Sequence, residues 1–274
     1  MQNLLNEQLK NLTFVAFDTE TSGAYPVGFD IVEFGAVKWK DGQVIDQLQF
    51  LFKPRELMSD FIIGIHGITN EMVSDCLPMS AEIHKIYDFL KGSIPVAHHA
   101  PFDMGFVGYE FEKAKLEFLT EPVLCSSLLS RKWISGVQNH KLQTLVQHLQ
   151  LDGGSAHRAL DDAQSCLGVF LACCEKIGWD RPLSEAIKSQ GKNLQWIDYK
   201  LIASSDEKTR KLVQACSEKL TVNICYKGSK DVRQIQPIGI VRNPDGDFIE
   251  AFCLRDHQNK RFYINRIDQM TLKK

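Results

Sequence analysis

Three strand-like segments follow one another near the start of the chain and constrain its fold more than any other feature. Residues 12–18 read LTFVAFD, residues 30–40 read DIVEFGAVKWK and residues 43–54 read QVIDQLQFLFKP. Each is rich in β-branched or aromatic residues and is bounded by Gly, Pro or Asp-Gly, which is typical of strands. Asp41-Gly42 predicts a hairpin turn between the second and the third. A chain that starts in this way is expected to build an antiparallel sheet.

Strands and helices alternate after this start. Short strands are predicted at PVAHH (residues 95–99) and PVLCS (residues 122–126). Helices are predicted at residues 69–73, 81–90, 101–115, 127–133, 141–149 and 158–176. In the last helix an apolar stripe at spacings of three and four leaves Asp162 outside the core. The sequence therefore predicts an α/β fold in which helices cover a mixed sheet.

The pattern changes after residue 178. Residues 179–218 are polar and helical in character, which predicts a connector. Four short strand-like runs follow, at residues 220–226, 232–242, 247–255 and 260–267, and predict a small β-barrel or curled sheet. We therefore expect a first domain at residues 1–178, a helical linker at residues 179–218 and a second domain at residues 219–274.

The charge of the chain is distributed unevenly. Residues 1–178 carry 14 Lys/Arg and 22 Asp/Glu, a balance of -8, whereas residues 179–274 carry 18 and 12, a balance of +6. A basic C-terminal third beside an acidic body suits a protein that holds a polyanion, although a solvated lysine-rich surface would give the same balance. Met1–Leu12 lacks the continuous apolar run of a signal peptide or membrane span. We expect a cytoplasmic protein without a membrane partner.

The eight cysteines are scattered and form no CxxC pair, which favours reduced, packed thiols. The alternative is a metal or redox site at the vicinal pair Cys173 and Cys174, but no second pair of ligands accompanies it.

Five reactive side chains lie at predicted strand ends and helix starts. Asp18 and Glu20 are two residues apart at the end of the first strand, so that both carboxylates point to one side of the sheet. Asp103 opens the helix after the fourth strand, and His157 and Asp162 bracket the start of the long helix. Polar groups at such positions converge on one edge of an α/β sheet. A spacing of five on a continuous helix would separate His157 from Asp162 by about 140°, so His157 is predicted to precede the helix.

Four carboxylates at one edge predict a divalent metal site. Two unit charges ~4 Å apart repel by ~4 kcal/mol at an effective dielectric of ~20, so a cation has to lie between them. Oxygen ligands without cysteine favour Mg²⁺ or Mn²⁺, and two such ions clamp the attacking and leaving oxygens of a phosphoryl displacement. A histidine with a pKa near neutrality accepts the proton of the attacking water.

Three ordered motifs carry a resemblance to a known family. FDTETSG (residues 17–23), AHHAPFDMGF (residues 97–106) and AHRALDDA (residues 156–163) resemble the exonuclease motifs of the DEDDh superfamily, which includes proofreading subunits of bacterial DNA polymerases. IHGIT (residues 65–69) and the run HKLQTLVQHLQL are similar to that family as well. The resemblance covers roughly residues 12–176 and implies a ribonuclease H-like fold, 3′-to-5′ exonuclease activity and two divalent ions, Mg²⁺ or Mn²⁺.

The same resemblance implies a role for each of the five side chains. Asp18 is expected to bridge both metals, Glu20 and Asp162 to hold the first, and Asp103 to support the second through water. His157 is expected to be the general base.

The resemblance also implies contacts with the terminal nucleotide. They are expected from Thr21, Ser22, His66, His99 and Phe102. The family usually has His-Asn where this chain has His98-His99, so that His99 is expected to alter the rate or the substrate preference but not the metals. The histidines His84, His140 and His148 are interpreted as structural.

The C-terminal segment resembles a WYL domain, a small SH3-like β-barrel of bacterial regulators that is linked to binding of nucleic acids or ligands. Phe248-Ile249-Glu250 stands where the Trp-Tyr-Leu triplet is usual. Nucleic-acid contacts are predicted from Arg233, Arg255, Arg261 and Arg266. The alternative is that these arginines are merely solvated and that the aromatic residues of the segment form its core.

Two hypotheses about function follow. The first is a 3′-to-5′ exonuclease that acts on single-stranded or frayed 3′ ends, DNA or RNA with DNA favoured, with a possible polymerase or repair partner. The second is a nucleic-acid-binding or regulatory protein without catalysis, in which the C-terminal domain is the sensor. A repulsive carboxylate cluster favours the first, because binding alone gains nothing from it.

Overall fold

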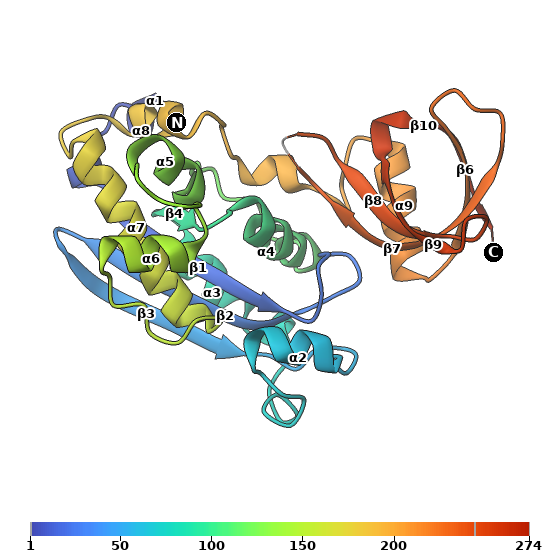
Figure 1. The fold of residues 1–274 in the computed structure, drawn as a ribbon, viewed down its shortest axis with the longest axis horizontal. Coiled ribbons are helices and arrows are strands. Elements are labelled where there is room, and N and C mark those ends of the chain that lie inside the picture. Colours follow the sequence, from blue (N-terminus) through green and yellow to red (C-terminus); the bar gives the residue numbers. More distant parts are fainter. Residues whose placement is uncertain (1, 244, 274) are drawn as a thin grey trace.

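The computed structural model describes residues 2–243 and 245–273, which contain two five-stranded sheets (Figure 1). The first sheet has the order β3-β2-β1-β4-β5. Its strands are β1 (Phe14–Thr21), β2 (Ile31–Lys40), β3 (Gln43–Leu51), β4 (Ile94–Ala97) and β5 (Leu124–Cys125). β1, β2 and β3 pair antiparallel, whereas β4 pairs parallel with β1 and with β5. The predicted mixed sheet is therefore confirmed.

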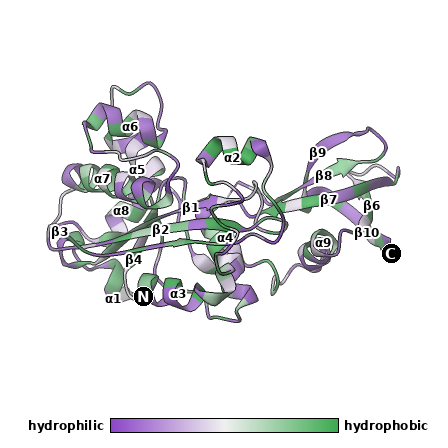
Figure 2. Ribbon diagram, turned by 90° about the horizontal axis from the view of Figure 1, so that it is seen from below, coloured by the Kyte–Doolittle hydropathy of each residue, from purple (hydrophilic) through white to green (hydrophobic). Residues whose placement is uncertain are grey.

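Helices cover both faces of this sheet, as Figure 2 shows from the edge. They are α1 (Gln2–Leu5), α2 (Asp60–His66), α3 (Ile83–Leu90), α4 (Pro101–Lys113), α5 (Ser126–Trp133), α6 (Leu142–Leu149), α7 (Ala159–Ile177) and α8 (Leu183–Gln190). Because side chains alternate along a strand, Val15 and Phe17 of β1 pack toward α3 and α4, whereas Phe14 and Ala16 pack toward α5 and α7. The α7 side is therefore the side that residues 18 and 20 also face.

The second sheet is antiparallel throughout and has the order β10-β6-β7-β8-β9. Its strands are β6 (Thr221–Tyr226), β7 (Arg233–Val241), β8 (Phe248–Cys253), β9 (Gln258–Tyr263) and β10 (Ile267–Lys273), and α9 (Glu207–Ser217) packs against β7 and β10. A short 3-10 turn at Ile264–Arg266 splits the last predicted strand into β9 and the start of β10. Among the described residues no pairing joins β9 to β10, so the prediction of a second, all-β domain is confirmed as an all-antiparallel sheet, whereas the SH3-like barrel is not confirmed.

The predicted linker packs largely on the first domain. Leu183 of α8 lies in the core beside α7, and Trp196 is fully buried beside β1 and α4. A β-bridge joins Leu194 to Val123, and the side chain of Gln190 accepts a hydrogen bond from the backbone N–H of Cys125. The boundaries proposed for the three segments stay predictions.

The loop after β1 packs into the second domain. Val27 is buried in the same apolar cluster as Leu212 of α9 and Ile240 of β7. A Cβ added at Gly239 would lie 2.1 Å from the Cβ of Tyr25, so only glycine leaves room for this loop on β7. The strand bends there, because the register of β7 shifts between residues 237 and 239.

One local prediction was wrong. Residues 69–73 form a turn rather than a helix, because the side-chain amide of Asn70 exchanges two hydrogen bonds with the backbone of Met58. The neighbouring helix α2 was not predicted. All eight cysteines are free, and six of them are buried. No helix within residues 2–243 and 245–273 is long and apolar enough to span a membrane.

Candidate active site

The end of β1 presents two carboxylates to α7. Asp18 and Glu20 continue the alternation of Phe14 and Ala16, whose side chains face that helix. Glu20 is 9% exposed, the charge of Asp162 raises its pKa, and the charges of Glu20 and Asp162 both raise the pKa of Asp18. Both side chains therefore point to one side of the sheet, as predicted.

Asp103 reaches the same place from the first turn of α4. β4 runs parallel to β1, so the helix that follows it begins at the end of β1 where Asp18 and Glu20 lie. Pro101 opens the helix, where its missing N–H leaves no backbone partner unsatisfied. Asp103 is 2% exposed, and one of its oxygens accepts hydrogen bonds from the backbone N–H (3.1 Å) and the hydroxyl (2.8 Å) of Thr19. Thr19 thereby fixes the second motif against the first.

His157 and Asp162 lie at the start of α7, which begins at Ala159. His157 precedes the helix, as predicted, and has a left-handed backbone with φ 61°. Its backbone N–H donates to Asp162 Oδ2 at 2.9 Å, and Gln143 Nε2 donates to Oδ1 at 3.1 Å. Both oxygens of Asp162 are thereby oriented.

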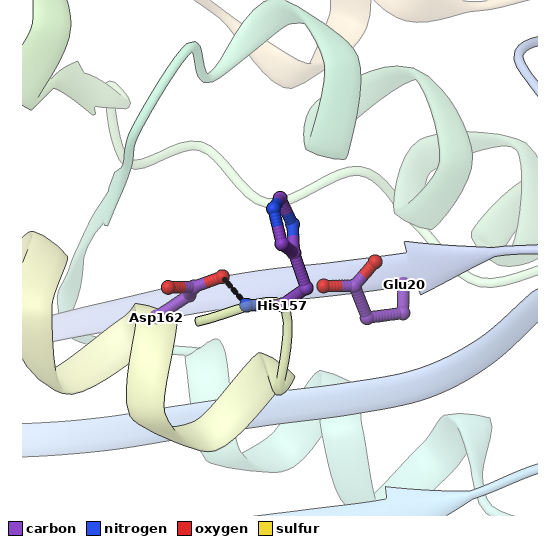
Figure 3. A group of neighbouring side chains, drawn as sticks. All are labelled: Glu20, His157 and Asp162. Atoms are coloured by element: carbon purple, nitrogen blue, oxygen red, sulfur yellow. Dashed lines mark hydrogen bonds between the residues drawn. The ribbon is translucent and has the colours of Figure 1, made fainter. Parts of the chain in front are cut away.

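Figure 3 shows His157 between Asp162 and Glu20. One potential ligand atom from each of these three residues lies within 4.8 Å of the other two. Glu20 and Asp162 are buried, whereas His157 is exposed. A cluster of this kind has a closed carboxylate side and an open histidine side.

Burial and mutual repulsion raise the pKa of every carboxyl group in the cluster. Burial, then the charges of Asp103, Glu20 and Asp162, raise the pKa of Asp18 well above its usual range. Burial, then the charges of Asp162, Glu33 and Asp103, raise the pKa of Glu20 to about 8. Burial raises the pKa of Asp103 to about 7 despite the hydrogen bonds from Thr19, and it raises that of Asp162 despite the N–H of His157. Ionisation of all four carboxyl groups together is therefore unfavourable unless a cation is present.

The donor set fits divalent cations. Arg158 lowers the pKa of Glu20, but its guanidinium is hydrogen-bonded to Glu33, so the protein itself leaves the four-carboxylate cluster largely uncompensated. Carboxylate oxygens with no cysteine among them suit hard cations such as Mg²⁺ or Mn²⁺. The uncompensated negative charge and the oxygen-rich ligand set both indicate a metal site.

Two of the predicted substrate residues, Thr21 and Ser22, directly follow Glu20 at the end of β1. The Thr21 hydroxyl donates to the carbonyl of Gly23 at 2.7 Å, and the Ser22 hydroxyl accepts from the N–H of Asp30 at 2.9 Å, so both shape the loop after β1. His66 ends α2 and is buried, and its Nδ1 accepts from the N–H of Ile68 at 3.0 Å. Nε2 of His66 is buried and has no hydrogen-bond partner among the described residues.

His99 and Phe102 lie at the start of the second motif. His99 adopts a left-handed backbone with φ 68°, a conformation in which Asn, Asp and His are enriched. This explains why a histidine can stand where the family usually has asparagine. Phe102 is 36% exposed, and its ring centroid lies 5.0 Å from that of Phe106.

The four predicted arginines of the second domain do not form one group. Arg233 and Arg255 share the carboxylate of Asp256, at 2.9 Å and 3.4 Å. Lys260 binds the same carboxylate at 2.6 Å, so three cations surround one anion. The pKa of Asp256 is lowered accordingly, first by Lys260.

The other two arginines stack on separate rings. The guanidinium of Arg261 lies 3.9 Å from the ring centroid of Phe248, and that of Arg266 lies 5.0 Å from the ring centroid of Tyr263. Arg261 also lies near Tyr25, because its charge lowers the pKa of that tyrosine against the larger effect of burial. Of the two stacked arginines, Arg261 is thus the one near the loop after β1.

A cleft of about 450 Å³ lies between the loop after β1, residues 55–62 and the end of α9. Ser22 lines it on the first domain and Lys219 on the second, where Lys219 pairs with Glu56 at 2.7 Å. The cleft is therefore lined on the first domain by Ser22, which follows Glu20 by two residues in the sequence, and on the second domain by residues at the end of α9.

Sequence reasoning missed four residues that support the site, namely Thr19, Glu33, Gln143 and Arg158. Thr19 lies inside the first motif and Arg158 directly follows His157, so their positions in the motifs were the available signal. Glu33 is the register partner of Glu20 across the β1–β2 pair. Gln143 lies in the run HKLQTLVQHLQL that resembles the family, but no role was predicted for it.

Comparisons with known proteins agree with this geometry. A family model described as Exonuclease (RNase_T) matches residues 15–170, and a WYL domain model matches residues 207–272. DNA polymerase III PolC-type of Oceanobacillus iheyensis is 36% identical over 163 residues, which are 58% of this chain and 11% of that protein. The 3′-5′ exonuclease DinG of Bacillus subtilis is 35% identical over 165 residues, 60% of this chain and 18% of that protein. The chain thus spans less than a fifth of the length of both relatives.

A solved structure of exonuclease X in complex with 5′ overhanging duplex DNA has a similar fold. Its TM-score is 0.51 and its identity 24%, and the match covers 65% of this chain and 99% of that chain. At this identity the likeness concerns the fold alone.

Proposed function

The chain belongs to the exonuclease family whose model matches residues 15–170 and carries a WYL domain, and from this premise we propose that it is a metal-dependent 3′-to-5′ exonuclease. Its proposed substrate is a single-stranded or frayed 3′ end, with DNA favoured. Its proposed product is one nucleoside monophosphate per cycle.

The observation that carries this proposal is the convergence of four carboxylates and one histidine from three distant segments. Asp18 and Glu20 come from β1, Asp103 from α4, and His157 and Asp162 from the start of α7. A protein that only bound nucleic acid would gain nothing from a cluster whose members raise one another's pKa.

Asp18, Glu20, Asp103 and Asp162 would hold two divalent cations, Mg²⁺ or Mn²⁺. When bound, such ions stabilise the charge that develops on the oxygens of a phosphate under attack. Thr19 and Gln143 support this arrangement, because each orients a carboxylate with a hydrogen bond of 2.8–3.1 Å.

His157 is proposed to accept the proton of the attacking water. It lies on the open side of the cluster, where water and a strand end have access, and its backbone N–H is tied to Asp162. Imidazole is suited to this task because its pKa is near neutrality. The bond to the terminal phosphate then breaks at the 3′ oxygen of the preceding nucleotide.

Thr21, Ser22, His66, His99 and Phe102 are proposed to receive the terminal nucleotide. The half-exposed ring of Phe102 offers a stacking surface for a base, and the loop shaped by Thr21 and Ser22 offers polar groups beside the carboxylates.

The second domain is proposed to hold the strand that leads away from the site. Arg261 lies near the loop after β1, and Lys219 lies in the cleft that begins at Ser22. Exposed cations contact a phosphate backbone without regard to sequence. The segments that match this chain are parts of much longer proteins in both relatives. A polymerase or a repair protein is therefore a proposed partner rather than a necessary one.

A degradation assay tests the activity. A single-stranded DNA oligonucleotide labelled at its 5′ end is incubated with Mg²⁺ or Mn²⁺, and the shortened strands and released monophosphates are measured. We expect stepwise shortening by the wild type, a loss of at least about 100-fold in Asp18→Asn, and no loss in Asp88→Asn, an exposed carboxylate on α3. An oligonucleotide that binds but stays intact would instead support the regulatory hypothesis.

A further inference from the structure

Glu33 is a buried carboxylate that the proposed reaction does not use. It is 0% exposed, and in the β1–β2 register it lies opposite Glu20, on the same face of the sheet. Its charge raises the pKa of both Asp18 and Glu20. A fifth buried negative charge beside this repulsive cluster is unfavourable unless it has a partner that compensates it.

Its partner is the start of α7. The guanidinium of Arg158 spans both oxygens of Glu33, with Nη2 2.9 Å from Oε1 and Nε 3.2 Å from Oε2. The backbone N–H of Ala159 donates to Oε2 at 3.0 Å, and Gln49 Nε2 donates to Oε1 at 2.8 Å. Glu33 therefore holds two consecutive residues, one by its side chain and one by its backbone.

The helix can reach Glu33 only because β2 has a glycine at the crossing point. A Cβ added at Gly35 would lie 2.2 Å from the backbone nitrogen of Leu160 and 2.3 Å from the backbone carbon of Ala159. The backbone of α7 and that of β2 are thus in direct contact beside the ion pair.

His157 immediately precedes these two anchored residues and has a strained backbone. A non-glycine residue at φ 61° persists only where its surroundings determine it. Its own N–H is held by Asp162, and the next two residues are held by Glu33. On the other side of His157, the backbone N–H of Ser155 donates to Asp161 Oδ2 at 2.8 Å, so that this part of the loop is tied to α7 and not to Glu33.

We propose that Arg158 and Glu33 are positioning residues for His157: their buried ion pair fixes the first turn of α7 and so keeps the left-handed His157 beside Glu20 and Asp162. The inference rests on the proposed function for its effect on the reaction. The pair also neutralises Glu33, so that this carboxylate does not add a full charge to the cluster.

The planar guanidinium of Arg158 is the group that positions His157, because it spans both oxygens of Glu33. A lysine keeps the charge but cannot span two oxygens. We therefore compare Arg158→Lys with a matched control, Arg242→Lys in the second domain. Arg242 is likewise partly buried and bound to a carboxylate, that of Asp247. Arg158→Met and Glu33→Gln serve as stronger perturbations where they fold.

Steady-state kinetics on the 5′-labelled oligonucleotide give the first readout. A displaced base lowers the rate of chemistry more than binding, so Arg158→Lys is expected to lower kcat about 10- to 100-fold and to change KM by less than about threefold. Arg242→Lys is expected to leave kcat within about twofold of the wild type.

A double-mutant cycle separates positioning from general stability. If Arg158 acts through His157, Arg158→Lys in a His157→Ala background lowers the residual rate by less than about twofold. Full multiplication of the two effects would overturn the proposal, because the pair would then act independently of His157.

Hydrogen exchange of the metal-free protein gives a readout that needs no activity. Arg158→Lys is expected to speed exchange of the amides of residues 155–160 and to leave those of α4 unchanged, whereas Arg242→Lys leaves both unchanged. Unchanged exchange at residues 155–160 overturns the proposal. If the wild type degrades no oligonucleotide, the proposed function fails, and exchange alone decides whether the pair holds the His157 loop.

Discussion

Replacing Glu20 by glutamine is expected to stabilise the metal-free protein while it abolishes activity. Glu20 is 9% exposed, and no hydrogen bond to its carboxylate is found in the described part of the chain. The substitution therefore removes a charge without breaking a contact. The carboxylates that remain also repel one another less.

The size of the effect follows from the pKa of Glu20, which is raised from 4.5 to about 8. At about 1.4 kcal/mol per pKa unit, this corresponds to an upper limit of ~5 kcal/mol. Because the neighbouring carboxyl groups share protons with Glu20, we expect about 2 to 4 kcal/mol at pH 8. For a chain of this size, that range is a rise in Tm of roughly 3 to 7 °C.

The sign depends on pH in a defined way. A carboxyl group with a raised pKa binds more protons in the folded state, so the wild type loses unfolding free energy as pH rises from about 4.5 to about 8. The glutamine variant lacks this contribution. The difference between the two proteins should be near zero at pH 4.5 and complete at pH 8.

Urea unfolding in EDTA at pH 4.5, 6 and 8 measures this difference, with the exposed carboxylate variant Glu117→Gln as the control. Millimolar Mn²⁺ should narrow the difference, since a ligand at ten times its Kd stabilises the wild type by about 1.4 kcal/mol and the variant by less. A Glu20→Gln protein that is no more stable than the wild type at pH 8 in EDTA would refute the repulsive cluster.

Three further outcomes are expected. His99→Asn should keep Tm within about 2 °C, because asparagine readily adopts φ 68°, and should alter KM or kcat on the labelled oligonucleotide; a large loss of Tm would contradict this. Gly35→Ala should destabilise the protein by at least about 1 to 3 kcal/mol in urea, because the added Cβ meets backbone rather than a flexible side chain. Burial lowers the pKa of His98 to about 4, so the folded state binds fewer protons at this group, and its contribution to the unfolding free energy should fall by about 1 to 3 kcal/mol as pH drops from 6.5 to 4. His98→Gln should remove this contribution and gain stability relative to the wild type over that range, and a difference between the two proteins that does not change with pH would count against a buried neutral imidazole.

The sequence predicted the main sheet and the cluster because local pattern and spacing determine both. The alternation in β1 places Asp18 and Glu20 on one face, and the spacing of His157 and Asp162 excludes a continuous helix between them. These inferences need no knowledge of distant segments.

The rest depended on tertiary contacts. The turn at residues 69–73 is set by Asn70 and Met58, twelve residues apart, which outweigh its helical pattern. Glu33 and Arg158 are 125 residues apart, and in the sequence each charge alone is typical of a solvated side chain. The last predicted strand, at residues 260–267, runs from β9 into the start of β10, because its apolar pattern continues through the 3-10 turn between them.

The packing of Val27 and Tyr25 against the second domain has a consequence for protein engineering. A chimera made by transplanting residues 12–176 into another scaffold would carry a β1–β2 connection that lacks the surface on which it rests. A working graft would have to bring the bend of β7 with it, or supply another glycine facing Tyr25 in its place.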